Sequence, residues 1–465
     1  MIIDNPRPIL RQQNSKASWF GNVNLLFYAF TSVFYTRIIV TTISAPSMVN
    51  QAHFMIVPGI FLIILFTAQK QDLQQVRLVN SLLRGLLVLT IAILLSAFWN
   101  GAGIVNALAS FMMLGEPLVF LAAIVCIPMT WQSFTRIKTW FMWSVAINFT
   151  LAAIQKPLID SYILYADGFN GTDGCGGVFF VSGAGNYVSA AVSITVAIYF
   201  LQNRNVALWI RACVFLAAFW HVLFSDSKQL VFAYVAAWLL LALFSFQRIE
   251  RGIKILLALV IFTLGFYWCV QNIEAFRAYT AWARPELYGA DGEVWYAKFY
   301  SVRQIISNFE SPFNWLFGLG PGHTVSRLGA WFLRDYASLL VPLGATTTSI
   351  GIDAREFVSE FWLTFSSSMF SPIFGWAGIW GDLGLLGLCS YIYLGSLVWR
   401  NFCWNSYLKI TLYSILVLGF IFTQMEEPGY MISVAMLLGL AWQEKRLKTN
   451  MRNSHLKLGS NRVIS

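Results

Sequence analysis

The residues best suited to chemistry gather in one long polar segment, residues 271–372, between two hydrophobic stretches. Basic side chains are frequent in it, and arginine and lysine bind phosphate oxygens through charge-assisted hydrogen bonds. The segment also carries His323 and Glu360, side chains that can exchange a proton with a substrate. We therefore expect an anionic substrate here, with Lys298, Arg303 and Arg327 as its ligands.

Three alternating glycines, Gly318, Gly320 and Gly322, precede His323. Such a string can indicate a nucleotide-binding loop, but that interpretation needs a strand–loop–helix context, which the flanking sequence lacks. We interpret the glycines as a sharp turn that presents His323. The histidine then has either a structural role or a role as acid, base or phosphate donor.

Upstream of this turn, four apolar residues recur at the spacing of one helical face. Lys298 and Arg303 flank that face on opposite sides. A helix of this type can lie in the membrane interface with its cations at head-group level. The cations are then either interfacial anchors or the ligands of a lipid diphosphate. The four apolar residues are Trp295, Phe299, Val302 and Ile306.

The composition indicates a membrane protein. Of the 465 residues, 58% are hydrophobic and 11% charged, and the mean hydropathy is +0.64, whereas a soluble protein carries about 25% charged residues. The net charge of +10 does not indicate nucleic acid, because the basic residues lie mostly in short loops and tails, as the positive-inside rule requires. The six cysteines show no metal-ligand spacing, and we expect no cofactor.

The hydrophobic pattern predicts an all-α polytopic protein with about twelve transmembrane helices. We expect nine of them in residues 1–270, one large outward loop in 271–372, three more helices in 373–443 and a basic cytoplasmic tail in 444–465. The predicted spans are Trp19–Ser44, Phe54–Ala68, Ser81–Trp99, Ile104–Met129, Thr139–Gln155, Asn186–Leu201, Ala207–Phe224, Leu230–Phe246, Ile253–Val270, Ile373–Trp399, Leu408–Thr423 and Tyr430–Trp442.

The loops between these spans differ in charge according to side. Roughly two thirds of the 31 lysines and arginines lie in the loops of one side, which includes both tails. Basic residues in short loops stay on the cytoplasmic side of a membrane. Both termini are therefore predicted to be cytoplasmic, and residues 271–372 to face outward.

Two further positions are unusual for their place in the chain. Lys228 follows Asp226 in a tight hairpin between two spans, where it is either an interfacial anchor paired with Asp226 or a fixed cation for an anionic substrate. Glu116 falls near the middle of a span, and a carboxylate there is costly and is by default a functional hypothesis. Glu116 is then either protonated and without a function of its own, paired to a neighbouring helix, or a proton-coupling site in a transporter.

Three motifs, taken with the large loop before the last helices, resemble the O-antigen ligase/polymerase superfamily, which includes the Wzy-type polysaccharide polymerases. The Ser225-Asp226-Ser227-Lys228 hairpin is similar to a family hairpin that usually has Ser-Arg. The glycine turn of Leu316–Gly322 is similar to the turn in the family's large loop. Trp380–Gly387 is similar to the family's Glu-Leu-Gly motif, with Asp382 in place of the glutamate.

The resemblance implies a metal-independent glycosyltransferase of the membrane C type. Such an enzyme transfers a glycan from an undecaprenyl-diphosphate-linked donor to an acceptor sugar at the outer face of the bacterial inner membrane. By position, Lys228, and Lys298 or Arg303, take the places of the arginines that hold the diphosphate. The resemblance also implies a chain-length regulator or export proteins as partners, besides the lipid bilayer.

The reaction needs a base for the acceptor hydroxyl, and His323, Glu360 and Asp382 are the candidates. Attack opposite the leaving diphosphate would invert the anomeric centre. Ligases of the superfamily have a histidine before the Glu-Leu-Gly motif, and its absence here favours a polymerase over a ligase.

Two hypotheses from other functional classes compete with the hypothesis of an enzyme. A polysaccharide flippase also has about twelve helices, and Glu116 fits it, but the long loop and the lack of two matching halves do not. A non-catalytic membrane scaffold would leave the many cations of residues 271–372 unexplained.

Overall fold

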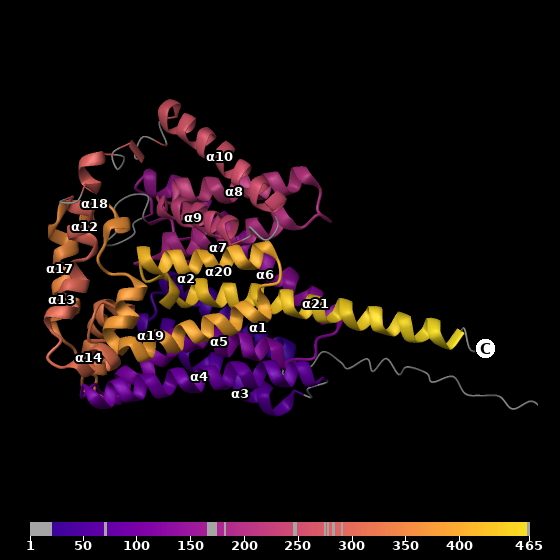
Figure 1. Cartoon of the computed structure of the whole chain (residues 1–465), viewed down its shortest axis with the longest axis horizontal. Helices are drawn as coiled ribbons and strands as arrows, with labels where there is room; N and C mark the ends of the chain where they lie inside the picture. The colour runs from indigo at the N-terminus through magenta and orange to yellow at the C-terminus, as the bar shows by residue number, and fades with distance from the viewer. Residues whose placement is uncertain are drawn as a thin grey trace, which may run out of the picture.

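The computed structural model describes residues 21–68, 72–164, 174–180, 183–244, 249–273, 276, 279–280, 284–289 and 292–462. Helix is the regular secondary structure throughout these residues. Long helices form a bundle, and a layer of short helices from residues 284–372 covers one end of it (Figure 1). We call the covered end the loop face. The N-terminal tail and several residues of the long polar segment, Arg277 among them, lie outside the described residues.

Each of the predicted apolar segments falls on a helix of the bundle, the first of them on the bent pair α1–α2. The bundle helices are α1 (Asn22–Phe34), α2 (Thr36–Ile43), α3 (His53–Thr67), α4 (Leu73–Trp99), α5 (Ile104–Cys126), α6 (Trp131–Asp160), α7 (Gly185–Gln202), α8 (Leu208–Phe224), α9 (Gln229–Leu243), α10 (Ile249–Asn272), α19 (Gly375–Phe402), α20 (Ser406–Ile421) and α21 (Pro428–Arg462).

The covering layer consists of short helices with the long polar segment's charges on them. It lies at the opposite end of the bundle from the C-terminal part of α21 (Figure 1). Its elements are η5 (Pro285–Tyr288), α12 (Glu293–Lys298), α13 (Tyr300–Ser307), α14 (Pro312–Phe317), the π-helical turn η6 (Leu328–Phe332), α15 (Leu333–Asp335), α16 (Ala337–Leu340), α17 (Ser349–Glu360), α18 (Trp362–Ser366) and η7 (Ser368–Phe370).

Several helices are long and apolar enough to span a membrane. Among the described residues five pass this test, and six do if α1 and α2, which meet at 56°, are one span. Four further apolar helices, α8, α9, α20 and the Leu256–Asn272 part of α10, are shorter. The fold is therefore compatible with a membrane protein, while the count of twelve crossings and their direction stay predictions.

The predicted interfacial helix around Lys298 is two helices. The backbone leaves the helical region at Phe299, between α12 and α13. Trp295, Phe299 and Ile306 nevertheless remain exposed on the covering layer. This apolar stripe is available to a membrane interface, as the spacing predicts, although two short helices carry it.

Helix length shapes the loop face. With a rise of about 1.5 Å per residue, the 27 residues of α4 extend about 40 Å, whereas the 13 residues of α1 and the 15 of α3 extend only about 20 Å. His53, the first residue of α3, contacts Glu116 in the middle of α5. The loop-face end of α3 therefore stops below the end of α5, and the bundle is recessed there.

The glycine turn of the long segment inserts into this end of the bundle and pairs with α19. Leu319 N–H donates to the Gly381 carbonyl (2.8 Å) and Gly320 N–H to the Asp382 carbonyl (3.0 Å). These bonds interrupt α19 at Gly384, where φ is 64° and ψ is −164°. Gly318 faces it with φ of 73° and ψ of −158°. Only glycine adopts this backbone region without strain.

We predict that Gly384→Ala destabilises the protein by at least about 2 kcal/mol, since the strain of this backbone region alone costs of order 1–3 kcal/mol. An added Cβ would also lie 2.4 Å from backbone atoms of Leu316. The measurement is thermal unfolding of the purified protein in detergent. Gly395→Ala is the control, because its Cβ would meet nothing within 4 Å and it lies in the same helix. Equal melting temperatures for the two variants would contradict the prediction.

Candidate functional site

Asp382 holds the inserted glycine turn. Its carboxylate accepts hydrogen bonds from the N–H groups of Gly322 (2.7 Å) and Thr324 (2.8 Å) and from the hydroxyls of Thr324 and Ser326 (both 2.6 Å). The side chain is 2% exposed. Both carboxylate oxygens are thus occupied, so Asp382, predicted as a possible base, has the geometry of an anchor for the turn.

His323 is part of the same turn, and both of its ring nitrogens have partners. Nδ1 donates to the Leu319 carbonyl (2.8 Å), which leaves Nε2 to accept from the Thr346 hydroxyl (2.7 Å). The ring is 7% exposed. The structure brings the predicted residues His323 and Asp382 together, and both hold the turn against the bundle.

Lys298 is the last residue of α12, and it is half-buried between the covering layer and the bundle. Its Nζ donates to the carbonyls of Met369 (3.2 Å), Ser371 (2.8 Å) and Ile421 (2.8 Å), and it lies 4.8 Å from the centre of the Phe374 ring. Burial lowers the pKa of this ammonium to about 7. All three donors of Lys298 are used to fix α12 to the end of α20, and none is free for a diphosphate.

The other predicted residues of the covering layer and hairpin are apart from the turn. Lys228 forms an ion pair with Asp226. Arg303 is exposed and donates to the Tyr296 carbonyl (2.7 Å). Glu360 is exposed at the end of α17, on the covering layer.

Arg327 is the predicted cation that reaches the recess. Its guanidinium forms an ion pair with Glu427 (2.8 Å) and donates to the Glu426 carbonyl (3.1 Å). Its backbone N–H donates to Glu426 Oε2 (2.7 Å). The loop between α20 and α21 and the start of η6 are thereby joined, and Arg327 remains about a quarter exposed.

Arg37 faces the same recess from α2. Arg37 and Arg327 line one cleft with Glu427, and the charges of Glu427 and Arg327 act on Arg37. Of the residues that the structure describes, none forms an ion pair with Arg37. The remaining lining residues are Val33, Thr36, Asn50, Gln51, His53, Phe179, Pro428 and Gly429. We call this space the arginine cleft.

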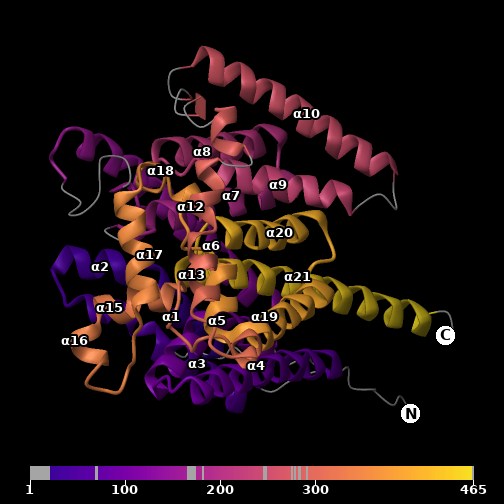
Figure 2. The same cartoon turned by 60° about the vertical axis from the view of Figure 1, so that its left-hand side comes forward.

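The covering layer also reaches the edge of the arginine cleft. The Tyr336 hydroxyl donates to the Ser47 carbonyl (3.2 Å) and accepts from Gln51 Nε2 (3.3 Å). Figure 2 shows α15 and α16, which flank Tyr336, beside α2. The cleft is therefore built from four distant parts of the chain: the first helices, the 3₁₀ turn that ends at Phe179, the inserted turn with Arg327, and the loop before α21.

Several polar groups of the described residues in and around the cleft lack the partners that buried groups usually have, and Glu116 Oε2, next to His53, is one of them. Both amide atoms of the buried Asn50 side chain have no hydrogen-bond partner among the described residues, and Asn50 lines the cleft. Behind it, Glu426 Oε1 is likewise buried without a partner. Burial raises the pKa of Glu426 to about 8, although the Arg327 N–H opposes this shift.

His53 lines the arginine cleft as well, and its Nδ1 lies 2.8 Å from Glu116 Oε1. This buried contact pairs Glu116 with a neighbouring helix, which is one of the alternatives given for it, while proton coupling stays a prediction. Neither His53 nor a role for Arg37 is predicted from the sequence. The available signals were an arginine inside an apolar run and a histidine at the start of the next one.

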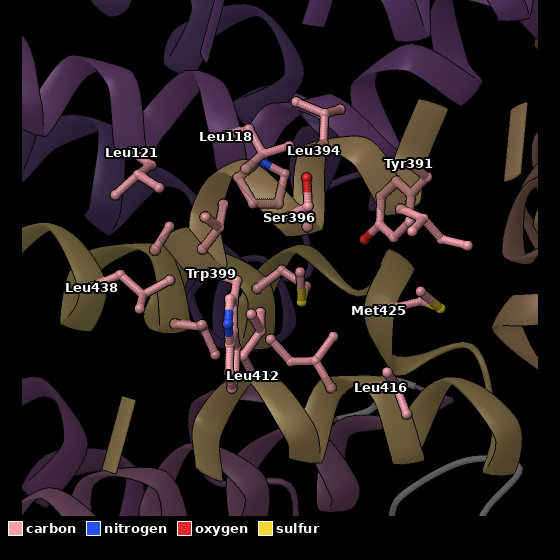
Figure 3. A pocket seen from close by; sticks show the side chains of 18 of the residues that line it. Leu118, Leu121, Tyr391, Leu394, Ser396, Trp399, Leu412, Leu416, Met425 and Leu438 are labelled. Carbon is pink, nitrogen blue, oxygen red and sulfur yellow. The ribbon is translucent and has the colours of Figure 1, made fainter. Parts of the chain in front are cut away.

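An apolar cavity of about 610 Å³ lies in the bundle on the other side of the Gln424–Glu427 loop. Side chains of α5 and α19 point into it from above in Figure 3, those of α20 from below, and Leu438 of α21 from the left. Met425 lines the cavity, whereas Glu427, two residues on, lines the arginine cleft. The labelled lining residues are Leu118, Leu121, Tyr391, Leu394, Ser396, Trp399, Leu412, Leu416, Met425 and Leu438.

The arrangement suits an amphipathic anion. Two guanidiniums and a buried amide face a recess at the loop face, and an apolar cavity lies behind the loop that bounds it. In the part of the chain that the structure describes, no three His, Cys, Asp or Glu side chains group as metal ligands would. Comparison of the sequence with protein-family models finds no matching family, and comparison with curated proteins finds no match.

We predict that Lys298 makes the stability of the protein depend on pH. The folded lysine releases its proton near pH 7, while the unfolded lysine holds it to about pH 10. The unfolded state then binds more protons, so the unfolding free energy rises between these values, by up to about 1.4 kcal/mol per pH unit. Thermal unfolding from pH 6 to pH 9 should show this rise in the native protein and not in Lys298→Met. Parallel curves would be evidence against it.

Proposed function

We propose that the chain is a polysaccharide polymerase of the bacterial inner membrane. It transfers a glycan from an undecaprenyl-diphosphate-linked donor to an acceptor sugar at the outer face of the membrane. The proposal rests on one observation above the others: Arg37, unpaired among the described residues, and Arg327 line the same recessed cleft at the loop face.

Two converging guanidiniums match the chemistry of a leaving diphosphate. Arginine binds phosphate oxygens in a planar, two-pronged arrangement, and negative charge develops on the diphosphate as the glycosidic bond breaks. Fixed cations aimed at that charge are the largest single contribution to catalysis in many enzymes. Glu427 holds the Arg327 guanidinium in place from the other side (2.8 Å).

The depth of the cleft supports a lipid-linked substrate. The short α1 and α3 leave the cleft below the loop-face end of α5, near the level of the middle of that helix, and we propose that the diphosphate of the donor enters it from the loop face. The apolar cavity beyond Met425 offers space for hydrocarbon, and its volume of about 610 Å³ lies within the usual range of ligand pockets. We assign it to the proximal isoprene units of the donor.

The difference in charge between the two ends of the bundle supports the proposed orientation of the protein in the membrane. At the end opposite the loop face, Arg446 pairs with Asp72 (2.9 Å), and Gln443 donates to the Ile124 carbonyl (2.7 Å). The loops at this end are those with the excess of lysine and arginine. We therefore place this end and both termini in the cytoplasm, and the arginine cleft outside.

Two other functions remain as alternatives. An O-antigen ligase performs the same chemistry on a different acceptor. A polysaccharide flippase is favoured by one specific observation, the His53–Glu116 pair, because ionisable residues that pair within the membrane often form proton relays in transporters. Proteoliposomes with an undecaprenyl-diphosphate oligosaccharide separate the three: longer lipid-linked glycans indicate a polymerase, transfer to a separate lipid acceptor a ligase, and movement across the membrane without transfer a flippase.

We predict that Arg327→Gln and Arg37→Gln each reduce the initial rate of glycan transfer by about 100- to 1,000-fold, the cost of removing one donor from a developing anion. The assay resolves the lipid-linked products of reconstituted protein by size. Melting temperatures of the purified variants are recorded in parallel, so that unfolding is not mistaken for lost chemistry.

The matched control is Lys156→Gln, a loop-face cation that pairs with Asp160 and does not line the cleft. It should keep the native rate. Lys228→Ala and Arg303→Gln decide between the cleft and the cations that the family resemblance indicates. A complete loss in either of them, with activity retained in Arg327→Gln, would move the diphosphate away from the arginine cleft.

A further inference from the structure

The buried pair of His53 and Glu116 has no part in the diphosphate site, and its geometry is that of an oriented base. His53 begins α3 and is 6% exposed, and Glu116 lies in α5 and is 1% exposed. One carboxylate oxygen of Glu116 lies 2.8 Å from His53 Nδ1. A histidine whose ring is fixed by a carboxylate is a recurring unit of acid–base catalysis.

The protonation of Glu116 decides which nitrogen of His53 carries the proton. With Glu116 ionised, its carboxylate only accepts hydrogen bonds; Nδ1–H of His53 then donates to Oε1, and Nε2 keeps its lone pair. No described residue forms a hydrogen bond with Nε2. Because His53 lines the arginine cleft, this lone pair belongs to the same space as the two guanidiniums.

We propose that His53 is the catalytic base of the glycan transfer and that Glu116 is its positioning residue. This inference rests on the proposed function. His53 Nε2 accepts the proton of the acceptor hydroxyl as that oxygen attacks the anomeric carbon of the donor. The new glycosidic bond forms while the bond from the anomeric carbon to the diphosphate oxygen breaks. The diphosphate leaves with the bonding electron pair, and Arg37 and Arg327 stabilise its charge.

The other candidate bases have geometries that exclude them from this step. Both nitrogens of His323 have partners, in Leu319 and Thr346, and both oxygens of Asp382 accept hydrogen bonds, from Gly322 and Thr324. Glu360 is exposed on the covering layer and does not line the cleft. Glu427 lines the cleft, but its carboxylate pairs with Arg327 (2.8 Å). Among the described lining residues, His53 is left as the neutral acceptor.

The charges around His53 suit a base that becomes a cation during the reaction. Glu116 faces it from α5 and offsets the positive charge of the imidazolium. Arg37 from α2 and Arg327 from the turn face the cleft, and Glu427 from the loop before α21 lies between these charges. The departing diphosphate adds further negative charge on the same side, so the proton transfer and the bond cleavage stabilise each other.

The test compares His53→Gln, Glu116→Gln and the double variant in reconstituted glycan transfer. His53→Gln should lower kcat by about 100- to 10,000-fold, the usual contribution of a general base, and leave the binding of undecaprenyl diphosphate unchanged. Glu116→Gln should cause a smaller loss. Because Glu116 acts through His53, the double variant should be no slower than His53→Gln alone, whereas independent roles would multiply the two losses.

Imidazole provides a second measurement, which a purely structural role of the pair would not satisfy. His53→Ala leaves a space beside Glu116, and added imidazole should restore part of kcat. His221→Gln is the matched control, since His221 is also buried in the bundle and hydrogen-bonded to Ser193 (2.9 Å) but lies outside the cleft. Its folded fraction should keep the native kcat.

The outcomes separate the inference from the function on which it rests. Native kcat in folded His53→Gln, or a double variant whose loss is the product of the single losses without rescue by imidazole, would overturn the role of His53. Native protein that makes no product with any acceptor would instead overturn the proposed function.

Discussion

The carboxylate of Asp382 is the interaction on which this loop face depends. Irregular backbone inside a membrane protein needs partners from the protein itself, since lipid offers none. The Asp382 carboxylate accepts hydrogen bonds from Gly322, Thr324 and Ser326. Where α19 is interrupted, its free backbone carbonyls accept hydrogen bonds from Leu319 and Gly320. A segment of the covering layer can therefore descend into the bundle, and Arg327 follows directly after it.

The recess gives these polar groups their function. Short helices end early beside the long α4 and α5, so the polar ends of α3 and of the loop before α21 meet below the loop face. Arg37, His53, Arg327 and Glu427 converge there although they are far apart in the chain. Lys298 donates to three carbonyls, one of them at the end of α20, and so holds the covering layer against the bundle. Lys298 and Asp382 are thus anchors only, whereas Arg327 both joins the loop before α21 to η6 and faces the cleft.

The sequence predicts the helices well and the site only in part. Apolar runs of about 20 residues determine helices in lipid, and each predicted run falls on a helix of the bundle. The glycine turn and the motif around Asp382, selected independently, do pack together, because glycine pairs such as Gly318 and Gly384 have few alternatives. The surroundings of Lys298 were not predictable, because a lysine in a polar segment of the sequence gives no sign that its ammonium group will be buried. The partner of Glu116 was equally hidden, since 63 positions separate it from His53.

The most direct measurement of the central claim is photo-labelling of the reconstituted protein with an undecaprenyl diphosphate analogue that carries its reactive group on the terminal phosphate. Peptides that contain the label are then identified by mass spectrometry. If the arginine cleft holds the diphosphate, the label will fall on the segments around Arg37, Asn50–His53, Arg327 and Glu427, and Arg327→Gln will remove it. Labelling confined to the Ser225–Lys228 hairpin or to α12 and α13, and unchanged in Arg327→Gln, would contradict the account.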